Sequence, residues 1–314
     1  MIVDAQAHLW QSDRPTRPWP PGAGPAHREV PPTVEELLTA MDGSGVGHAV
    51  LVPPSWEGDR NDVVLAAADA RPDRFSVMGR VAVHGSRWAW RLDELRGRPG
   101  VRGVRLTLHR SPWRELFTAG HLDRFWAAVE RAGLPVMVYA PDLTGALNSV
   151  ATAHPGLRLV LDHLCLPLGA RDEAAFAGLD DLLTLARHPH VAVKASALPC
   201  HTTDAYPFRS LHEPLRRVFD TFGPHRMFWG SDWTRLPCPY DQAVTLFTEQ
   251  LDFLRGRDKD LVMGDALMRW LDPPAAPQWA RSSSPPRPAD TTASGPRHAL
   301  PLPRPHPRSQ TPET

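Results

Sequence analysis

The chain has 314 residues, with 35 basic and 35 acidic side chains and therefore no formal net charge. A balanced charge provides no basic field for nucleic acid, and no apolar run approaches the ~18 residues that cross a membrane. The N-terminus lacks the basic and apolar regions of a signal peptide. Three cysteines without a CxxC pair (Cys165, Cys200 and Cys238) suggest reduced thiols, so we expect a cytoplasmic protein that acts on a small molecule. The oligomeric state is not indicated.

The first 32 residues predict a short strand followed by a long loop. Residues 2–8 begin almost at the N-terminus, so a strand there must be paired and buried. The Pro-rich residues 10–32 contain Trp10 and Trp19 and are too many for a simple connection. In a barrel, we expect this loop to lie over the mouth.

Strands and helices then alternate to about residue 270. Thr33 and Glu36 have the spacing of a capping box and predict the start of the first helix, which ends near residue 42. Apolar runs predict further strands at 46–52, 75–83, 101–108, 134–141, 157–163, 191–196 and 226–233. Further helices are predicted at 62–70, 88–96, 122–132, 143–154, 173–187, 212–222, 241–256 and 258–270.

This alternation predicts an α/β fold, a single (β/α)8 TIM-barrel domain over residues 1–272. The strands are continuous apolar runs, as expected when both faces of a parallel sheet are covered. A doubly wound open sheet is the competing fold. It usually has a Gly-rich phosphate loop after an early strand, and the sequence has none.

Residues 273–314 differ in composition from the rest of the chain. Pro, Ser, Thr and Arg dominate this segment. It cannot bury enough apolar surface to offset the entropy of ordering, so we expect a disordered tail without a catalytic part.

The last predicted strand, in residues 226–233, ends in an acid. The apolar Met-Phe-Trp run is followed by Gly-Ser and then by Asp232. Parallel barrels carry their chemistry at the C-terminal ends of the strands, so Asp232 is a candidate catalytic group. The structural alternative is that Ser231 and Asp232 only form a turn or a helix N-cap.

Polar side chains also occur near the C-terminal ends of other predicted strands. Each has a structural alternative: Lys194 could pair with a carboxylate, Tyr139 could be a core residue with a satisfied hydroxyl, and His163 could lie at a helix terminus. Several such residues at the same ends of different strands favour a shared site. The candidates are Gln6, His8, Trp10, Arg105, Thr107, Tyr139, His163, Lys194, Ser196 and Asp232.

Four motifs resemble the amidohydrolase-related TIM-barrel hydrolases of the amidohydrolase 2 branch. They are Asp-Ala-Gln-Ala-His-Leu-Trp at 4–10, Leu-Asp-His at 161–163, Val-Lys-Ala-Ser at 193–196 and Trp-Gly-Ser-Asp-Trp at 229–233. The resemblance covers residues 2 to about 272. The first and last motifs are fairly specific together and in this order.

The pattern of strand-end residues is most similar to the metal-independent pyrone-dicarboxylate lactonases of that branch. The resemblance implies opening of a lactone or similar cyclic ester by a water that Asp232 activates as general base, with His163 assisting. It also implies polarisation of the lactone carbonyl by Arg105, His8 and Tyr139. We further expect Gln6, Lys194 and Trp10 to contribute to substrate binding.

The resemblance leaves the metal and the substrate open. Metal-dependent relatives carry His-x-His on the first strand, where this chain has Gln6 and His8, so we expect no metal. If a divalent metal such as zinc is bound, its expected ligands are His8, His163 and Asp232. Arg110 and Arg114 are candidates for holding a substrate carboxylate. The alternative functions are a metal-dependent decarboxylase and a barrel that binds a small molecule without catalysis.

Overall fold

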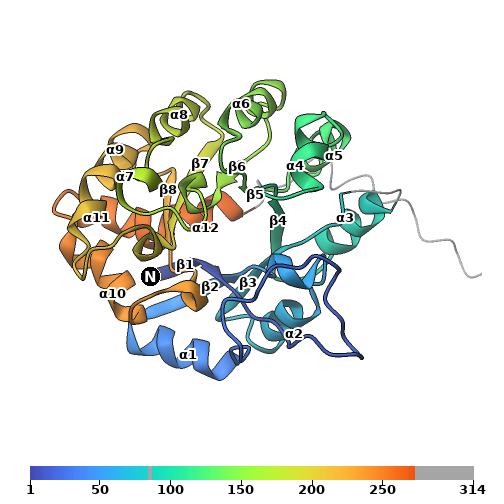
Figure 1. Cartoon of the computed structure of the whole chain (residues 1–314), viewed down its shortest axis with the longest axis horizontal. Coiled ribbons are helices and arrows are strands. Elements are labelled where there is room, and N and C mark those ends of the chain that lie inside the picture. The colour runs from blue at the N-terminus through green and yellow to red at the C-terminus, as the bar shows by residue number, and fades with distance from the viewer. Residues whose placement is uncertain (84–86, 273–314) are drawn as a thin grey trace, which may run out of the picture. The chain divides into compact units, whose positions relative to one another are not determined.

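Eight parallel strands form a barrel in the computed structural model, which describes residues 1–83 and 87–272 (Figure 1). Each strand pairs in parallel with the next along the chain, as the sequence predicted. The strands are β1 (Ile2–Ala7), β2 (Val46–Leu51), β3 (Phe75–Gly79), β4 (Val101–Thr107), β5 (Val136–Tyr139), β6 (Leu159–Leu161), β7 (Val191–Ser196) and β8 (Met227–Gly230). Contacts group residues 1–274 into one unit. The predicted tail at 273–314 lies outside the described residues.

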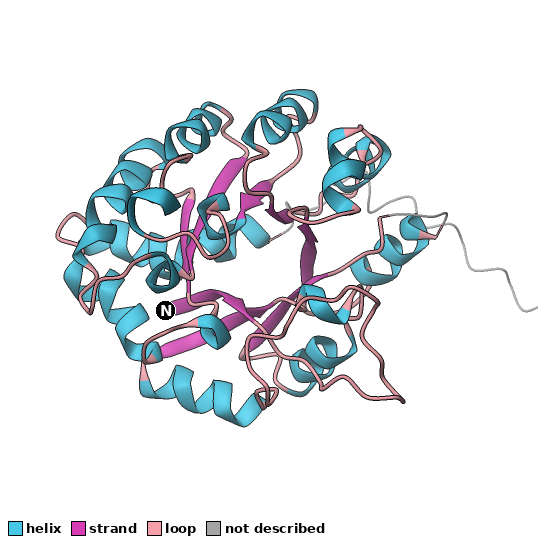
Figure 2. Cartoon of the chain, in the orientation of Figure 1, coloured by secondary structure: helices cyan, strands magenta, loops and turns pink. Residues whose placement is uncertain are grey.

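Helices surround the strands on the outside of the barrel (Figure 2). The α-helices are α1 (Val34–Gly43), α2 (Asp62–Ala70), α3 (Trp88–Arg96), α4 (Trp113–Thr118), α5 (Asp123–Arg131), α6 (Thr144–Ala153), α7 (Asp172–Ala175), α8 (Leu179–Thr184), α9 (His212–Phe222), α10 (Tyr240–Thr245), α11 (Gly256–Asp260) and α12 (Ala266–Leu271). Thr33 and Glu36 form the predicted capping box of α1. Among the described helices, none is long and apolar enough to cross a membrane.

The helix predictions differ from the structure in four places. The predicted helix 173–187 is divided into α7, α8 and a 3-10 turn, with Gly178 at the break, where glycine disfavours a continuous helix. The two closing helices are interrupted by π-helical segments at 246–250 and 261–265. Helix α4 was not predicted.

Alternation along the strands separates an outer core from the barrel interior. On β7, Val191, Val193 and Ala195 pack outward against the helices, whereas Ala192 packs inside. The interior layer is apolar near the N-terminal ends of the strands, where Phe228 packs with Leu267 of α12. Because this end is closed by apolar side chains, polar groups gather at the opposite end.

The loop after β8 joins the last strand to the first. The Asp232 N–H donates to the Gln6 carbonyl oxygen at 2.9 Å, and the Ser231 N–H donates to Asp4 Oδ1 at 2.8 Å. Gly230 packs closely against β1, because an added Cβ would lie 3.2 Å from the Gln6 nitrogen and would require a small shift. A register shift between Asp4 and Ala7 interrupts the pairing of β1 with β2. Such bulges redirect side chains near sites.

Candidate active site

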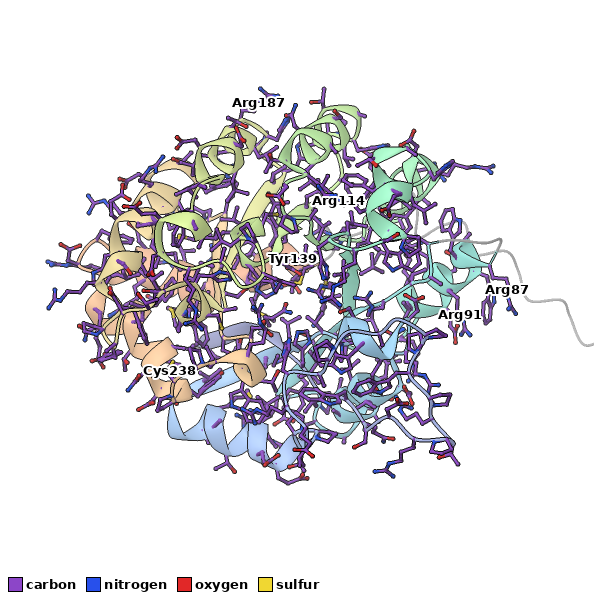
Figure 3. All side chains as sticks on the ribbon, viewed as in Figure 1. Arg87, Arg91, Arg114, Tyr139, Arg187 and Cys238 are labelled. Atoms are coloured by element: carbon purple, nitrogen blue, oxygen red, sulfur yellow. The ribbon has the colours of Figure 1, made fainter. Side chains whose placement is uncertain are left out.

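A small cavity of about 160 Å³ lies at the C-terminal ends of the strands. Gly24, Pro25 and His27 line it, so the loop of residues 10–32 lies over the mouth, as expected. Figure 3 places Tyr139 near the middle of the barrel, whereas Arg187 lies on its periphery. The other lining residues are Ser55, Trp56, Arg105, Thr107, His109, Arg110, Tyr139, His163, Leu168, Asp232 and Arg235.

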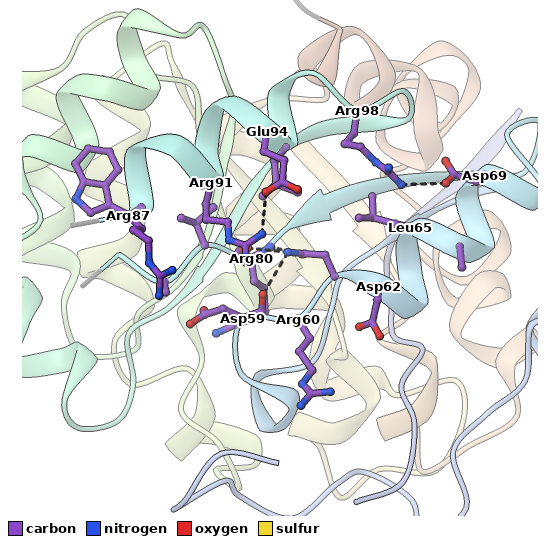
Figure 4. Close-up of a pocket in the computed structure, with 16 residues that line it drawn as sticks. Asp59, Arg60, Asp62, Leu65, Asp69, Arg80, Arg87, Arg91, Glu94 and Arg98 are labelled. Atoms are coloured by element: carbon purple, nitrogen blue, oxygen red, sulfur yellow. Dashed lines mark hydrogen bonds and ion pairs between the residues drawn. The ribbon is translucent and has the colours of Figure 1, made fainter. Parts of the chain in front are cut away.

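A larger cavity of about 1000 Å³ lies outside the barrel, between α2 and α3 (Figure 4). Two ion pairs lie among its charged side chains. Arg91 bonds to Glu94 at 2.8 Å, and Arg98 bonds to Asp69 at 3.0 Å. None of the polar strand-end residues predicted from the sequence lines it, so we place the candidate site in the smaller cavity.

Asp232 is buried in the smaller cavity in a left-handed conformation, with φ at 52°. The turn around it is formed by its neighbour: Ser231 Oγ donates to Asp4 Oδ2 and accepts from the Trp233 N–H. Asp232 begins the next 3-10 turn, but its side chain makes no capping hydrogen bond. The turn is therefore held by Ser231, and the Asp232 carboxylate is left for other partners.

The two carboxylate oxygens of Asp232 face different groups. Oδ2 accepts from Arg235 Nη1 at 3.3 Å. Oδ1 lies 3.1 Å from His8 Nε2, but no donor reaches it with hydrogen-bond geometry. Burial by itself raises the pKa of Asp232, but its interactions with His8, and more weakly with His163 and His27, outweigh burial and bring the pKa well below 3.8. Asp232 is thus an ionised base near neutral pH.

The His8 ring is oriented by a backbone group. Its Nδ1 lies 2.5 Å from the Val52 carbonyl oxygen, which can only accept, so Nδ1 carries the proton. Its Nε2 lies 3.1 Å from Gln6 Nε2 as well as from Asp232 Oδ1. His8 therefore points its second nitrogen at the predicted base.

His163 follows β6 in a strained backbone turn. His163, Leu164 and Cys165 all have positive φ, which is unusual for residues other than glycine. The His163 Nδ1 bonds to Ser196 Oγ at 2.8 Å, and its Nε2 lies 3.9 Å from Asp232 Oδ2. Burial lowers the pKa of His163 to about 3, so the ring is neutral at physiological pH.

A buried ionic cluster lies beneath the cavity. Lys194 Nζ pairs with Asp162 Oδ1 at 2.7 Å and donates to Gln6 Oε1 at 2.7 Å. Arg105 Nε bonds to Asp162 Oδ2 at 3.1 Å. Burial raises the pKa of Asp162, but the charges of Lys194 and Arg105 outweigh it and lower the pKa. Lys194 and Gln6 are each 0% exposed and do not line the cavity.

Tyr139, Trp10 and Arg114 have other partners. The Tyr139 hydroxyl donates to the Leu166 carbonyl at 2.7 Å, so its proton is engaged although its ring lines the cavity. Trp10 packs edge to face against Trp56 at 5.2 Å between ring centroids, behind the cavity wall. Arg114 Nη1 donates to the Pro141 carbonyl at 3.2 Å and does not line the cavity, unlike Arg110.

Several lining residues were not singled out from the sequence. Arg235 follows Asp232 by three residues, and its place in the turn after β8 is a signal that could have identified it. His27 had no such signal, because it comes from an irregular loop. Burial lowers the pKa of His27 to about 3 and that of His109 to about 4, so both rings are neutral at physiological pH.

His8, His27 and Asp232 form a group whose donor atoms lie within 4.8 Å of one another. His27 Nδ1 bonds to Thr234 Oγ1 at 2.8 Å, which leaves Nε2 free. Two imidazole nitrogens and an unpartnered buried carboxylate oxygen match a three-ligand catalytic zinc site. The residues therefore fit a divalent metal. The group contains His27 where we had expected His163.

The chain belongs to the amidohydrolase family whose model matches residues 3–266. A relative from Burkholderia ambifaria, an L-fucono-1,5-lactonase, is 31% identical over 240 residues, covering 74% of this chain and 79% of the relative. An L-fucono-1,5-lactonase from Burkholderia multivorans is 27% identical over 259 residues, covering 78% of this chain and 86% of the relative.

Solved structures share the fold. An amidohydrolase from Burkholderia multivorans with bound zinc has a TM-score of 0.74 at 24% identity, covering 87% of this chain and 100% of that one. A probable 2-pyrone-4,6-dicarboxylic acid hydrolase from Acinetobacter baumannii, with citric acid bound, has a TM-score of 0.67 at 21% identity, covering 86% of this chain and 98% of that one.

Proposed function

We propose that this amidohydrolase hydrolyses a lactone, with Asp232 as the base that activates water. The observation that carries the proposal is the buried, ionised Asp232 carboxylate, whose Oδ1 has no hydrogen-bond donor while it faces a cavity lined by cations. The lactonase relatives support an ester substrate over an amide.

Asp232 has two features that a general base requires. It is unprotonated at neutral pH, because its pKa lies well below 3.8, and its Oδ1 has no hydrogen-bond donor. A water bound at Oδ1 would transfer one proton to the carboxylate while its oxygen forms a bond to the lactone carbonyl carbon. The hydrogen bond from Arg235 holds the other oxygen and fixes the direction of Oδ1.

Arg105 and Arg235 are the best placed groups for the developing oxyanion. Both line the cavity and both are held by buried carboxylates, so they are preorganised. The predicted role of Tyr139 in polarising the carbonyl would require its hydroxyl to leave Leu166. We therefore assign Tyr139 to shaping the cavity wall.

The ring-opening step returns the proton. When the tetrahedral intermediate collapses, the bond between the acyl carbon and the ring oxygen breaks, and the leaving alkoxide takes the proton held by Asp232. His163 Nε2, 3.9 Å from Oδ2, is close enough to assist this transfer. The product is a hydroxy acid, and the atoms of one water are consumed.

His8, His27 and Asp232 would hold a divalent metal, if one is bound. Such an ion would lower the pKa of a bound water and polarise the carbonyl. The roles of Arg105, Arg235 and His163 do not depend on it, so metal dependence is a separate question from lactone hydrolysis.

A substrate panel with and without a chelator tests the proposal. L-fucono-1,5-lactone, other sugar lactones and 2-pyrone-4,6-dicarboxylate should be assayed for acid release with purified full-length protein. We expect turnover of at least one lactone. Release of CO2 from aromatic acids without lactone hydrolysis would instead support a decarboxylase, and inactivity on the whole panel would support a binding protein.

A further inference from the structure

The buried Lys194 contacts three groups inside the barrel. Its Nζ lies 2.7 Å from Gln6 Oε1, 2.7 Å from Asp162 Oδ1 and 3.0 Å from Met137 Sδ. Two of these contacts are hydrogen bonds and the one to Asp162 is an ion pair. Burial lowers the pKa of Lys194, and the Asp162 carboxylate opposes that shift. The Gln6 oxygen can only accept, so Lys194 donates to it.

This arrangement determines which way the Gln6 amide points. Its oxygen must face Lys194, so its NH2 group faces His8, with 3.1 Å between Gln6 Nε2 and His8 Nε2. His8 Nδ1 already donates to the Val52 carbonyl. His8 Nε2 is therefore left with a lone pair, which accepts from the Gln6 amide.

The hydrogen bond from Gln6 to His8 also affects Asp232. His8 Nε2 accepts from Gln6 and cannot donate to Asp232 Oδ1 at the same time, although the two atoms lie 3.1 Å apart. An unprotonated His8 Nε2 agrees with the absence of a hydrogen-bond donor at the buried Oδ1. A direct hydrogen bond from His8 would occupy the lone pair that the base offers to water.

We propose that Lys194 and Gln6 are positioning residues that hold His8 Nε2 as an acceptor and so keep Asp232 Oδ1 open. Neither side chain touches the cavity, and each is 0% exposed. Their effect passes through the amide of Gln6 to the His8 ring. The kinetic consequence rests on the proposed lactone hydrolysis, whereas the order of hydrogen bonds does not.

Side-chain 15N NMR of the full-length protein tests the hydrogen-bond order without any substrate. The His8 ring is assigned by comparison with the H8Q variant. In the unmodified protein we expect a proton on Nδ1 and none on Nε2. In Q6E a carboxylate oxygen replaces the NH2 group, so Nε2 should gain a proton. A proton on Nε2 before substitution, or a Q6E spectrum identical to the unmodified one, would overturn the proposal.

The K194M variant tests whether Lys194 orients the Gln6 amide and so fixes the His8 tautomer, and M137L is the matched control. Removing the ammonium frees the Gln6 amide to turn, so we expect both His8 tautomers in K194M and one in M137L.

On a lactone that the protein hydrolyses, kcat should fall on the order of 10- to 100-fold in K194M and Q6E with KM unchanged. A raised KM with unchanged kcat would show direct substrate contact and refute the positioning role. If K194M does not fold, Q6E decides.

Discussion

The main-chain N–H of Asp232 donates to the carbonyl oxygen of Gln6 at 2.9 Å, which bonds the end of β8 to the end of β1. The proposed base is therefore fixed by its backbone to the strand that carries His8. Its positive φ of 52° turns the side chain into the cavity, and aspartate tolerates this conformation better than most residues. The closure of the barrel and the placement of the base depend on the same contact.

Replacing Asp232 with asparagine should abolish hydrolysis while preserving the fold. Asparagine keeps the shape and tolerates positive φ, but it cannot accept the proton of water. We expect kcat/KM to fall by about 10²- to 10⁴-fold, with little change in melting temperature. D142N is the control, because Asp142 is exposed and also has a positive φ, 59°. Undiminished turnover in D232N would remove Asp232 from the mechanism.

Ser231 should matter for stability more than for chemistry. It holds Asp4 through its hydroxyl and its N–H, and it accepts from the Trp233 N–H. In S231A the buried Asp4 loses one donor, so the free energy of unfolding should fall by about 1–3 kcal/mol. Urea denaturation measures the change. S149A, on the exposed face of α6, should have no comparable effect.

The sequence was sufficient for the barrel and for part of the site. The apolar runs predicted β4 and β7, and Arg105 and Lys194 near their C-terminal ends are buried. Asp232 follows β8 as predicted, because the apolar run before it forms a buried strand and the acid comes directly after that strand. These features depend on local pattern alone.

Other features depend on contacts that no local pattern encodes. His27 reaches the cavity from a Pro-rich loop without repeating structure, so nothing in its neighbourhood indicated a site. The register shift in β1 reverses the alternation along the strand, since Val3 and Ala5 pack inside the barrel whereas Ala7 packs in the outer core. The sequence offered pairing with a carboxylate as one possibility for Lys194. The partner, Asp162, was identified only from the fold.

His27 should contribute to metal affinity if the group of His8, His27 and Asp232 binds zinc. Isothermal titration of the chelated full-length protein with Zn²⁺ should give one site per chain, and H27A should weaken it, because three donors become two. H121A removes an exposed histidine and should leave the affinity unchanged. Equal zinc affinity in H27A and the unmodified protein would exclude His27 as a ligand.

Protonation of His163 or His27 should not affect the rate of hydrolysis between pH 8 and pH 5. Burial lowers the pKa of each from 6.5 to about 3, so neither ring gains a proton between pH 8 and pH 5. The pKa of Asp232 is depressed below 3.8, so the base also stays ionised over this range. We therefore expect kcat/KM, corrected for spontaneous lactone hydrolysis, to show no decline with an apparent pKa near 6.5. A decline near 6.5 that disappears in H163N or H27N would contradict this prediction.

The same depressed pKa predicts how Asp232 affects stability. A carboxylate whose pKa is lower in the folded state than in the unfolded state stabilises the fold above the unfolded value, here 3.8. That contribution is lost as the pH falls through the folded pKa. Melting temperatures of the unmodified protein and D232N should therefore converge as the pH falls below 3.8. A melting temperature of the unmodified protein that instead rises relative to that of D232N on acidification would mean that the pKa of Asp232 is raised in the folded state.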